Sequence, residues 1–164
     1  MRTLAIDVEN LDATHRFGAR LGGALRTGHV VALVGPLGSG KTMLVKGLAA
    51  GAGVADPRQV NSPSFVIVNE YAASAAGPFP RIYHIDAYRL RGSGDLEALG
   101  FDEMCGAGAV VVEWADRVED LLPADRLAIV LEPMDEHRRR FHCTATGPAS
   151  GDLLAALSAA GDFF

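Results

Sequence analysis

One segment constrains this chain more than any other. Gly35-Pro36-Leu37-Gly38-Ser39-Gly40-Lys41-Thr42 matches Gly-x-x-x-x-Gly-Lys-Ser/Thr, the pattern of a phosphate-binding P-loop. Residues 29–34 before it, apolar except for His29, predict a buried strand, and residues 43–50 after it have helix-forming composition. Because a P-loop needs a strand on one side and a helix on the other, the pattern and its context together predict nucleotide binding. The alternative is a glycine-rich turn that only joins the two elements.

Each part of this motif has a physical role. Its three glycines let the backbone turn tightly, so that N–H groups reach phosphate oxygens, and the following helix adds its positive dipole end. Lys41 supplies an exposed positive charge for the outer phosphates, and the Thr42 hydroxyl suits a Mg²⁺ ion. We therefore expect the loop to bind the phosphates, with Lys41 also acting in catalysis and Thr42 in metal binding.

Composition limits the classes of function. The 164 residues predict one domain over 1–164, with a sizeable core. Lys and Arg number 15 against 20 Asp and Glu, a net charge of −5, which disfavours direct binding to nucleic acid and leaves any contact with RNA to partner proteins. Cys105 and Cys143 lack metal-ligand spacing and predict reduced thiols. No apolar run suits a membrane helix or a signal peptide, so we expect a cytoplasmic protein.

Strand and helix patterns alternate along the chain. They predict strands over 3–8, 29–34, 65–71, 81–86, 109–114, 127–132 and 140–146, a surface hairpin loop over 72–80, and helices from Asn10 or Asp12 to Gly28, over 43–50, over 95–99 and over 152–160. This order predicts an α/β fold, a P-loop NTPase-like three-layer sandwich with a mostly parallel central sheet. The two adjacent late strands predict some antiparallel pairing.

Two predicted strands end in carboxylates, Asp86 and Glu113. Ligands of open parallel sheets lie beyond the carboxyl ends of the strands, where the P-loop also lies. If both strands run parallel to the P-loop strand, both acids face Thr42. A P-loop enzyme needs such an acid to hold Mg²⁺ and another group to orient the attacking water, so we expect both acids to be catalytic and metal-binding. The alternative is two solvated carboxylates.

Several further residues have two readings. His84 is either a base or a packed, hydrogen-bonding histidine on the face of Asp86. Tyr88 and Arg89 either line the phosphate site or serve in packing and a surface ion pair. Trp114 either stacks on a base, closes a lid or packs half-buried.

Two loops also remain open. The Ser62-Pro63-Ser64 segment supplies a hydroxyl near the metal or terminal phosphate, or is a proline turn. The tract Glu136-His137-Arg138-Arg139-Arg140 is a solvated turn, or one of its arginines reaches a phosphate.

These pieces follow one another in a specific order. After the P-loop come Asn61-Ser62-Pro63-Ser64-Phe65, Tyr71, His84-Ile85-Asp86-Ala87-Tyr88-Arg89-Leu90, Asp95-Leu96-Glu97-Ala98-Leu99-Gly100-Phe101 and Glu113-Trp114. The set resembles the TsaE family (also called YjeE), the ATPase component of tRNA threonylcarbamoyladenosine biosynthesis. The resemblance runs from about Asp12 to about Arg138. Ser64 stands where the family usually has Thr, and the 72–80 loop is longer than usual.

The resemblance implies a bacterial, cytoplasmic protein that binds ATP with Mg²⁺ and hydrolyses it slowly alone. It implies two partner proteins, TsaB and TsaD. TsaD transfers the threonylcarbamoyl group to an adenosine beside the tRNA anticodon, and hydrolysis by TsaE is expected to reset the complex between rounds.

By matching position, the resemblance also assigns roles to residues. Gly35 to Thr42 hold the phosphates, Thr42 and Glu113 bind the metal, and Asp86 is the Walker-B-like acid. Ser62 and Ser64 fall in a switch-like loop, and Arg138 is a basic residue near the nucleotide.

Two other functions use the same P-loop. A small-molecule kinase needs a second substrate pocket with an arginine-rich lid, whereas the one arginine-rich tract here is short and late. A regulatory module that binds ATP without turnover needs no acids at the strand ends, so Asp86 and Glu113 disfavour it.

Overall fold

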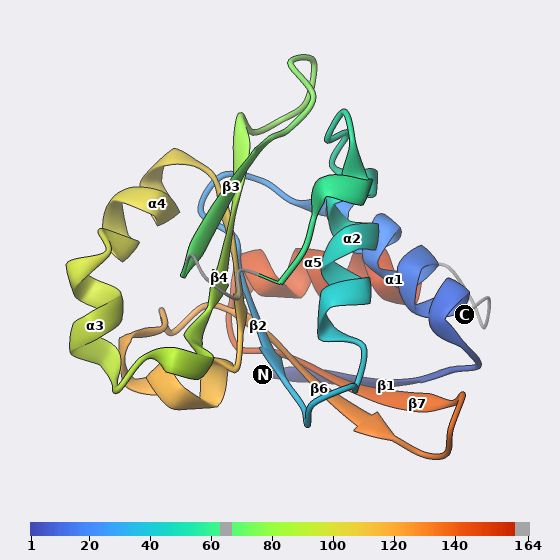
Figure 1. The fold of residues 1–164 in the computed structure, drawn as a ribbon. Helices are drawn as coiled ribbons and strands as arrows, with labels where there is room; N and C mark the ends of the chain where they lie inside the picture. Colours follow the sequence, from blue (N-terminus) through green and yellow to red (C-terminus); the bar gives the residue numbers. More distant parts are fainter. Residues whose placement is uncertain (63–66, 160–164) are drawn as a thin grey trace.

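The computed structural model describes residues 1–62 and 67–159, and within these ranges seven strands form one sheet (Figure 1). The strands are β1 (Arg2–Val8), β2 (Val30–Val34), β3 (Val68–Ala72), β4 (Arg81–Asp86), β5 (Ala109–Glu113), β6 (Leu127–Pro133) and β7 (Arg139–Ala145). Their order across the sheet is β1-β7-β6-β2-β5-β4-β3. None of the helices in the described part of the chain has the length and apolar character needed to cross a membrane.

Parallel pairing dominates the centre of the sheet. Strands β6, β2, β5 and β4 run parallel to one another, whereas β1 and β7 at one edge and β3 at the other add antiparallel pairs. The predicted α/β fold class is therefore confirmed. Antiparallel strands occur at both edges, because β3 and β4 also form a hairpin across the 72–80 loop.

Helices cover both faces and complete three layers (Figure 1). One face carries α1 (Leu11–Ala24), α2 (Lys41–Gly51) and α5 (Pro148–Ser158). The other carries α3 (Ser93–Ala98), α4 (Phe101–Ala107) and the 3₁₀ segment η3 (Ala115–Leu121). Short 3₁₀ turns, η1 (Pro57–Gln59) and η2 (Ala87–Arg89), lie in the connections. Strand β5 is buried along its whole length because helices cover it on both sides, as its continuous apolar run predicts.

Helices α1 and α2 approach each other unusually closely. Four glycines, two on each helix, lie in this contact, which we call the glycine seam: Gly18, Gly22, Gly47 and Gly51. A Cβ atom at Gly18 would lie 2.2 Å from the carbonyl oxygen of Leu44, and one at Gly47 would lie 2.1 Å from that of His15. No side chain fits at such distances, so the two backbones are in direct contact.

Element boundaries differ from prediction where local signals are weak. Helix α1 begins after Asn10, whose side chain accepts the Ala13 N–H at 2.9 Å, but it ends at Ala24 rather than at Gly28. Helix α5 begins at Pro148, four residues before the predicted start, since proline suits the first helical turn. Helix α4 was not predicted. Residues 65 and 66 of the predicted third strand lie outside the described residues.

Candidate functional site

The predicted P-loop connects β2 to α2, as its motif requires. Gly40 precedes the helix with φ of 104°, a left-handed conformation that favours glycine. A Cβ at Gly35 would lie 2.7 Å from the Ser39 hydroxyl oxygen and 2.8 Å from the Leu131 carbonyl oxygen. No side chain caps the first turn of α2. The helix N-terminus therefore offers its N–H groups and dipole to an anion.

Lys41 is buried rather than exposed, with 5% of its surface accessible. Its ammonium donates hydrogen bonds to the carbonyl oxygens of Gly35, at 2.6 Å, and Pro36, at 2.9 Å. It also lies 4.0 Å from the ring centre of Trp114. Burial lowers the Lys41 pKa, and the negative charge of Glu113 partly opposes this shift. The ammonium is thus bound by neutral carbonyl groups of its own loop. A phosphate can replace these carbonyl groups as its hydrogen-bond partner.

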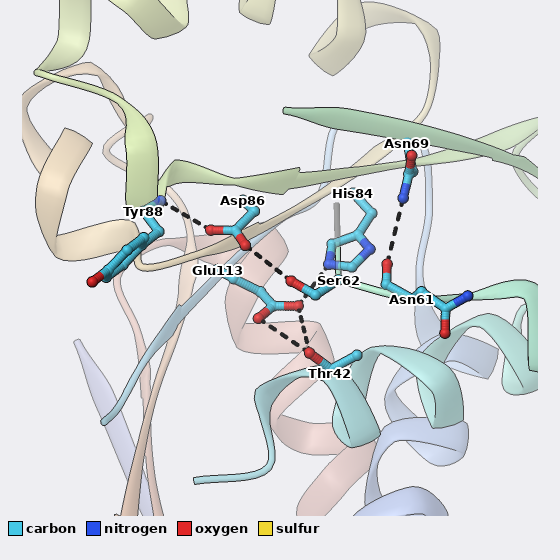
Figure 2. Close-up of polar contacts among 8 residues, drawn as sticks. All are labelled: Thr42, Asn61, Ser62, Asn69, His84, Asp86, Tyr88 and Glu113. Atoms are coloured by element: carbon cyan, nitrogen blue, oxygen red, sulfur yellow. Dashed lines mark hydrogen bonds and ion pairs between the residues drawn. The ribbon is translucent and has the colours of Figure 1, made fainter. Parts of the chain in front are cut away.

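Asp86 and Glu113 lie at the same sheet edge, as predicted. They are direct partners in the parallel register of β4 and β5, and both face α2 (Figure 2). The Thr42 hydroxyl lies 3.4 and 3.5 Å from the two Glu113 oxygens, longer than the usual ~2.7 Å of an O–H···O bond. Asp86 accepts the Ser62 hydroxyl at 3.0 Å and the Tyr88 N–H at 2.9 Å. The structure therefore brings the three predicted metal ligands together.

His84 also belongs to this group, because it contacts Glu113. Its side chain is fully buried, and Nε2 lies 2.7 Å from Oε1 of Glu113, which is itself only 2% exposed (Figure 2). The hydrogen-bonding reading of His84 is therefore the one the structure supports. We call the five side chains that meet here the acid cluster: Thr42, Ser62, His84, Asp86 and Glu113.

A cavity of about 500 Å³ opens between the P-loop and the acid cluster. Besides members of both, it is lined by Met43, Ile67, Tyr88, Arg89 and Trp114. Tyr88 and Arg89 thus lie at the site, as one of their two readings expected. Met43 and Ile67 were not predicted as lining residues, because apolar residues beside a motif give no sequence signal of a cavity.

Trp114 lines the cavity beside Lys41. It adopts φ of 56°, the only left-handed conformation of a non-glycine residue in the described chain. Such backbone conformations cost roughly 1–3 kcal/mol and occur where the surroundings enforce them. Its ring lies 5.0 Å from that of Tyr88, and the Arg117 guanidinium lies 4.8 Å from the Tyr88 ring. The Tyr88 and Trp114 rings therefore line this part of the cavity, and Arg117 supports the Tyr88 ring.

The arginine beside the P-loop is Arg139 rather than Arg138. Arg138 lies in the β6–β7 turn, pairs with Asp135 at 2.6 Å and does not line the cavity. Arg139 is 8% exposed and donates through Nε to the Ser39 carbonyl oxygen at 3.0 Å. Buried residues alternate along β7 from Arg139 to Phe141 and Cys143, and this alternation is the signal that identifies the inward-facing arginine.

The donor set at this edge is made of oxygen atoms. Within the described ranges, no three or more His, Cys, Asp or Glu residues converge as a metal site of their own. A hydroxyl and two carboxylates instead suit Mg²⁺, which keeps several waters and shares its coordination with substrate phosphates. The predicted contribution of Ser64 lies outside the described residues, whereas Ser62 contacts Asp86 directly.

Comparison with known proteins gives consistent matches. The family model described as threonylcarbamoyl adenosine biosynthesis protein TsaE matches residues 8–141. A TsaE protein of Bacillus subtilis is 41% identical over 134 residues, covering 81% of this chain and 80% of that protein. One from Mycobacterium leprae is 38% identical, covering 80% and 84%. The crystal structure of Bacillus subtilis YdiB is similar with a TM-score of 0.79 and 33% identity, covering 96% of this chain and 95% of that one.

Proposed function

The chain belongs to the TsaE family of threonylcarbamoyladenosine biosynthesis proteins, and from this premise we propose that it is a Mg²⁺-dependent ATPase that supports the TsaB–TsaD complex. The observation that carries the proposal is the meeting of P-loop and acids across one cavity. Lys41 and Thr42 lie on one wall, and Glu113 lies on the other.

Nucleotide binding is supported by the geometry of the phosphate loop. The α2 N-terminus, the Lys41 ammonium and the glycine-lined turn all favour an anion at the same place. The cavity of about 500 Å³ lies within the usual size range of small-molecule sites, roughly 300–1,000 Å³. The neighbouring Tyr88 and Trp114 rings add apolar surface to the polar floor.

Magnesium binding is supported by the oxygen donors at the site. The Thr42 hydroxyl and the Glu113 carboxylate are farther apart than in a normal hydrogen bond. Asp86 lies beside Glu113, as its partner in the register of β4 and β5. These residues would hold the ion, which supplies positive charge against the phosphate oxygens when bound. Within the protein, Glu113 and Asp86 provide the negative charge, and the Ser62 hydroxyl orients Asp86.

Hydrolysis requires a water held in line with the terminal phosphate. Glu113 and Asp86 are carboxylates at the floor of the cavity and are suited to accept hydrogen bonds from such a water. Lys41 then stabilises the negative charge on the transferred phosphoryl group. We propose that turnover alone is slow and that partner proteins complete the site.

The proposed partners follow from the family and agree with the charge of the chain. With 15 basic against 20 acidic residues, the protein is poorly suited to neutralise RNA phosphates itself. Contact with tRNA is therefore proposed to be indirect, through TsaB and TsaD.

Phosphate release from ATP, measured with and without the purified TsaB–TsaD pair, tests this function. We expect Mg²⁺-dependent release that rises when the pair is added. Negligible release under both conditions would contradict the proposal. Rapid consumption of ATP triggered by a small alcohol or nucleoside would instead indicate a kinase.

A further inference from the structure

His84 is buried completely yet has a single polar partner in the described part of the chain. Nε2 lies 2.7 Å from Oε1 of Glu113, whereas Nδ1 has no hydrogen-bond partner there. Buried polar groups are usually satisfied, so an imidazole kept in the core for one bond needs a reason. The reason offered by the geometry is the orientation of Glu113.

The hydrogen bond fixes the orientation of the Glu113 carboxylate toward Thr42. Because a carboxylate only accepts, the imidazole hydrogen lies on Nε2 and is donated to Oε1. The Thr42 hydroxyl lies 3.4 Å from Oε1 and 3.5 Å from Oε2, so the carboxylate presents both oxygens to the phosphate loop, and only Oε1 also contacts His84. The bond at Oε1 thus fixes the plane of the carboxylate, and Oε2 is the oxygen that has no contact with His84.

The sheet register explains why this histidine can reach Glu113. Asp86 is the direct partner of Glu113 across β4 and β5, and His84 precedes Asp86 by two residues. Residues two apart on a strand share a face, so β4 supplies both the second acid and the donor that holds the first. The Tyr71 ring centre lies 6.2 Å from that of the imidazole, with 36° between the ring planes.

We propose that His84 is a positioning residue: its bond to Oε1 holds the Glu113 carboxylate in the orientation in which it can bind the metal ion beside Thr42. This inference rests on the proposed function, since it assigns a metal to that position. His84 does not line the cavity and acts only through Glu113. Outer-sphere hydrogen bonds of this type commonly alter metal affinity or activity about 10–100-fold.

Three substitutions separate positioning from packing. His84→Phe keeps a ring but removes the donor. His84→Gln keeps an N–H donor at nearly the reach of Nε2, whereas His84→Asn is shorter and does not reach Glu113. Tyr83→Phe is the matched control, because Tyr83 is the neighbour on β4 whose side chain packs on the opposite face of the sheet.

The primary measurement is calorimetric binding of a non-hydrolysable ATP analogue at stepped Mg²⁺ concentrations, with thermal melting of each variant alongside. We expect His84→Phe and His84→Asn to raise the Mg²⁺ concentration needed for half-maximal tight binding about tenfold, with metal-free nucleotide affinity within about twofold of the parent. Turnover should show the same pattern, with kcat falling and KM for ATP nearly unchanged. His84→Gln should recover most of the loss.

The outcomes are distinct. Folded His84→Phe or His84→Asn with the parent's Mg²⁺ dependence would overturn the inference, as would His84→Gln as impaired as His84→Asn. If His84→Phe does not fold, the comparison of His84→Gln with His84→Asn decides whether His84 positions Glu113. A parent protein that binds no nucleotide at any Mg²⁺ concentration would overturn the proposed function itself, and the inference with it.

Discussion

The glycine seam and the acid cluster lie on the same face of the sheet but are built in opposite ways. In the seam, α1 and α2 touch through their backbones, and a Cβ at Gly47 would lie 2.1 Å from the carbonyl oxygen of His15. In the acid cluster, side chains from β4, β5, α2 and the 57–62 connection meet through hydrogen bonds, and Thr42 stays 3.4 Å from Glu113.

This difference separates two kinds of requirement. The seam is limited by space, so any added atom acts on stability and the chemical nature of that atom matters little. The cluster is limited by charge and hydrogen bonding, so a substitution of equal size acts on chemistry and leaves packing nearly intact. Substitutions in the two regions should therefore alter different measurements.

The largest expected effect is that of Lys41→Ala. The substitution removes the cation of the phosphate loop, and losing one such donor costs roughly 100–1,000-fold in turnover. Stability should stay near that of the parent, because burial already disfavours the charged ammonium. Phosphate release and thermal melting check both points, with Lys46→Ala, on the same helix, as the control. Retained turnover would break the P-loop assignment.

Glu113→Gln should have the second-largest effect, and it tests the role of charge in the acid cluster. Glutamine has nearly the same shape and still accepts a hydrogen bond from His84, but it lacks the negative charge. We expect turnover on the order of 100-fold lower, with metal-free nucleotide binding retained. Calorimetry at zero and saturating Mg²⁺ measures the two separately. An unchanged response to Mg²⁺ would show that Glu113 is not a metal ligand.

Gly47→Ala tests the seam. The added methyl group collides with the α1 backbone, and overpacking of this kind costs about 1–3 kcal/mol or more. The melting temperature should fall by about 2–4 °C for each kcal/mol lost. Gly23→Ala is the control, since its Cβ would lie 3.8 Å from its nearest neighbour and alanine favours helix. Equal melting temperatures for the two variants would contradict a space-limited seam.

The smallest expected effect is a change of stability with pH that arises from the buried thiol of Cys143. Burial raises the pKa of Cys143 from 9.0 to about 12. The unfolded chain therefore loses this proton near pH 9 while the folded chain keeps it, so stability falls as pH rises through that interval. At pH 10 this share is about 1 kcal/mol. Denaturant unfolding at pH 8 and pH 10 should show a smaller loss for Cys143→Ala than for the parent. Equal losses would exclude this thiol as the cause.

The sequence predicts most accurately where one local pattern decides the outcome. Strand β4 begins and ends where predicted, because alternating residues and a hairpin define it. Helix α4 was missed because, of its seven residues, Phe101 alone is buried, which leaves no helical periodicity. Trp114 was included in a strand because its left-handed φ depends on its surroundings and not on its residue type.

The site residues likewise divide into those that a local pattern predicts and those that depend on the rest of the fold. The meeting of Asp86 and Glu113 could be predicted, since parallel strands bring their carboxyl ends to one edge. The choice between Arg138 and Arg139 depended on where β7 begins, a boundary that a charged turn does not mark. The bond from His84 to Glu113 depends on the register of two strands, which is set by the whole sheet.

The seam also determines which wall of the cavity can adjust. Lys41 and Thr42 sit on the first turn of α2, and α2 cannot slide or roll while its backbone contacts α1. The phosphate loop is therefore the fixed reference of the site. We expect a change of shape on binding to come from Trp114 and Tyr88, which contact each other through their rings and not through their backbones.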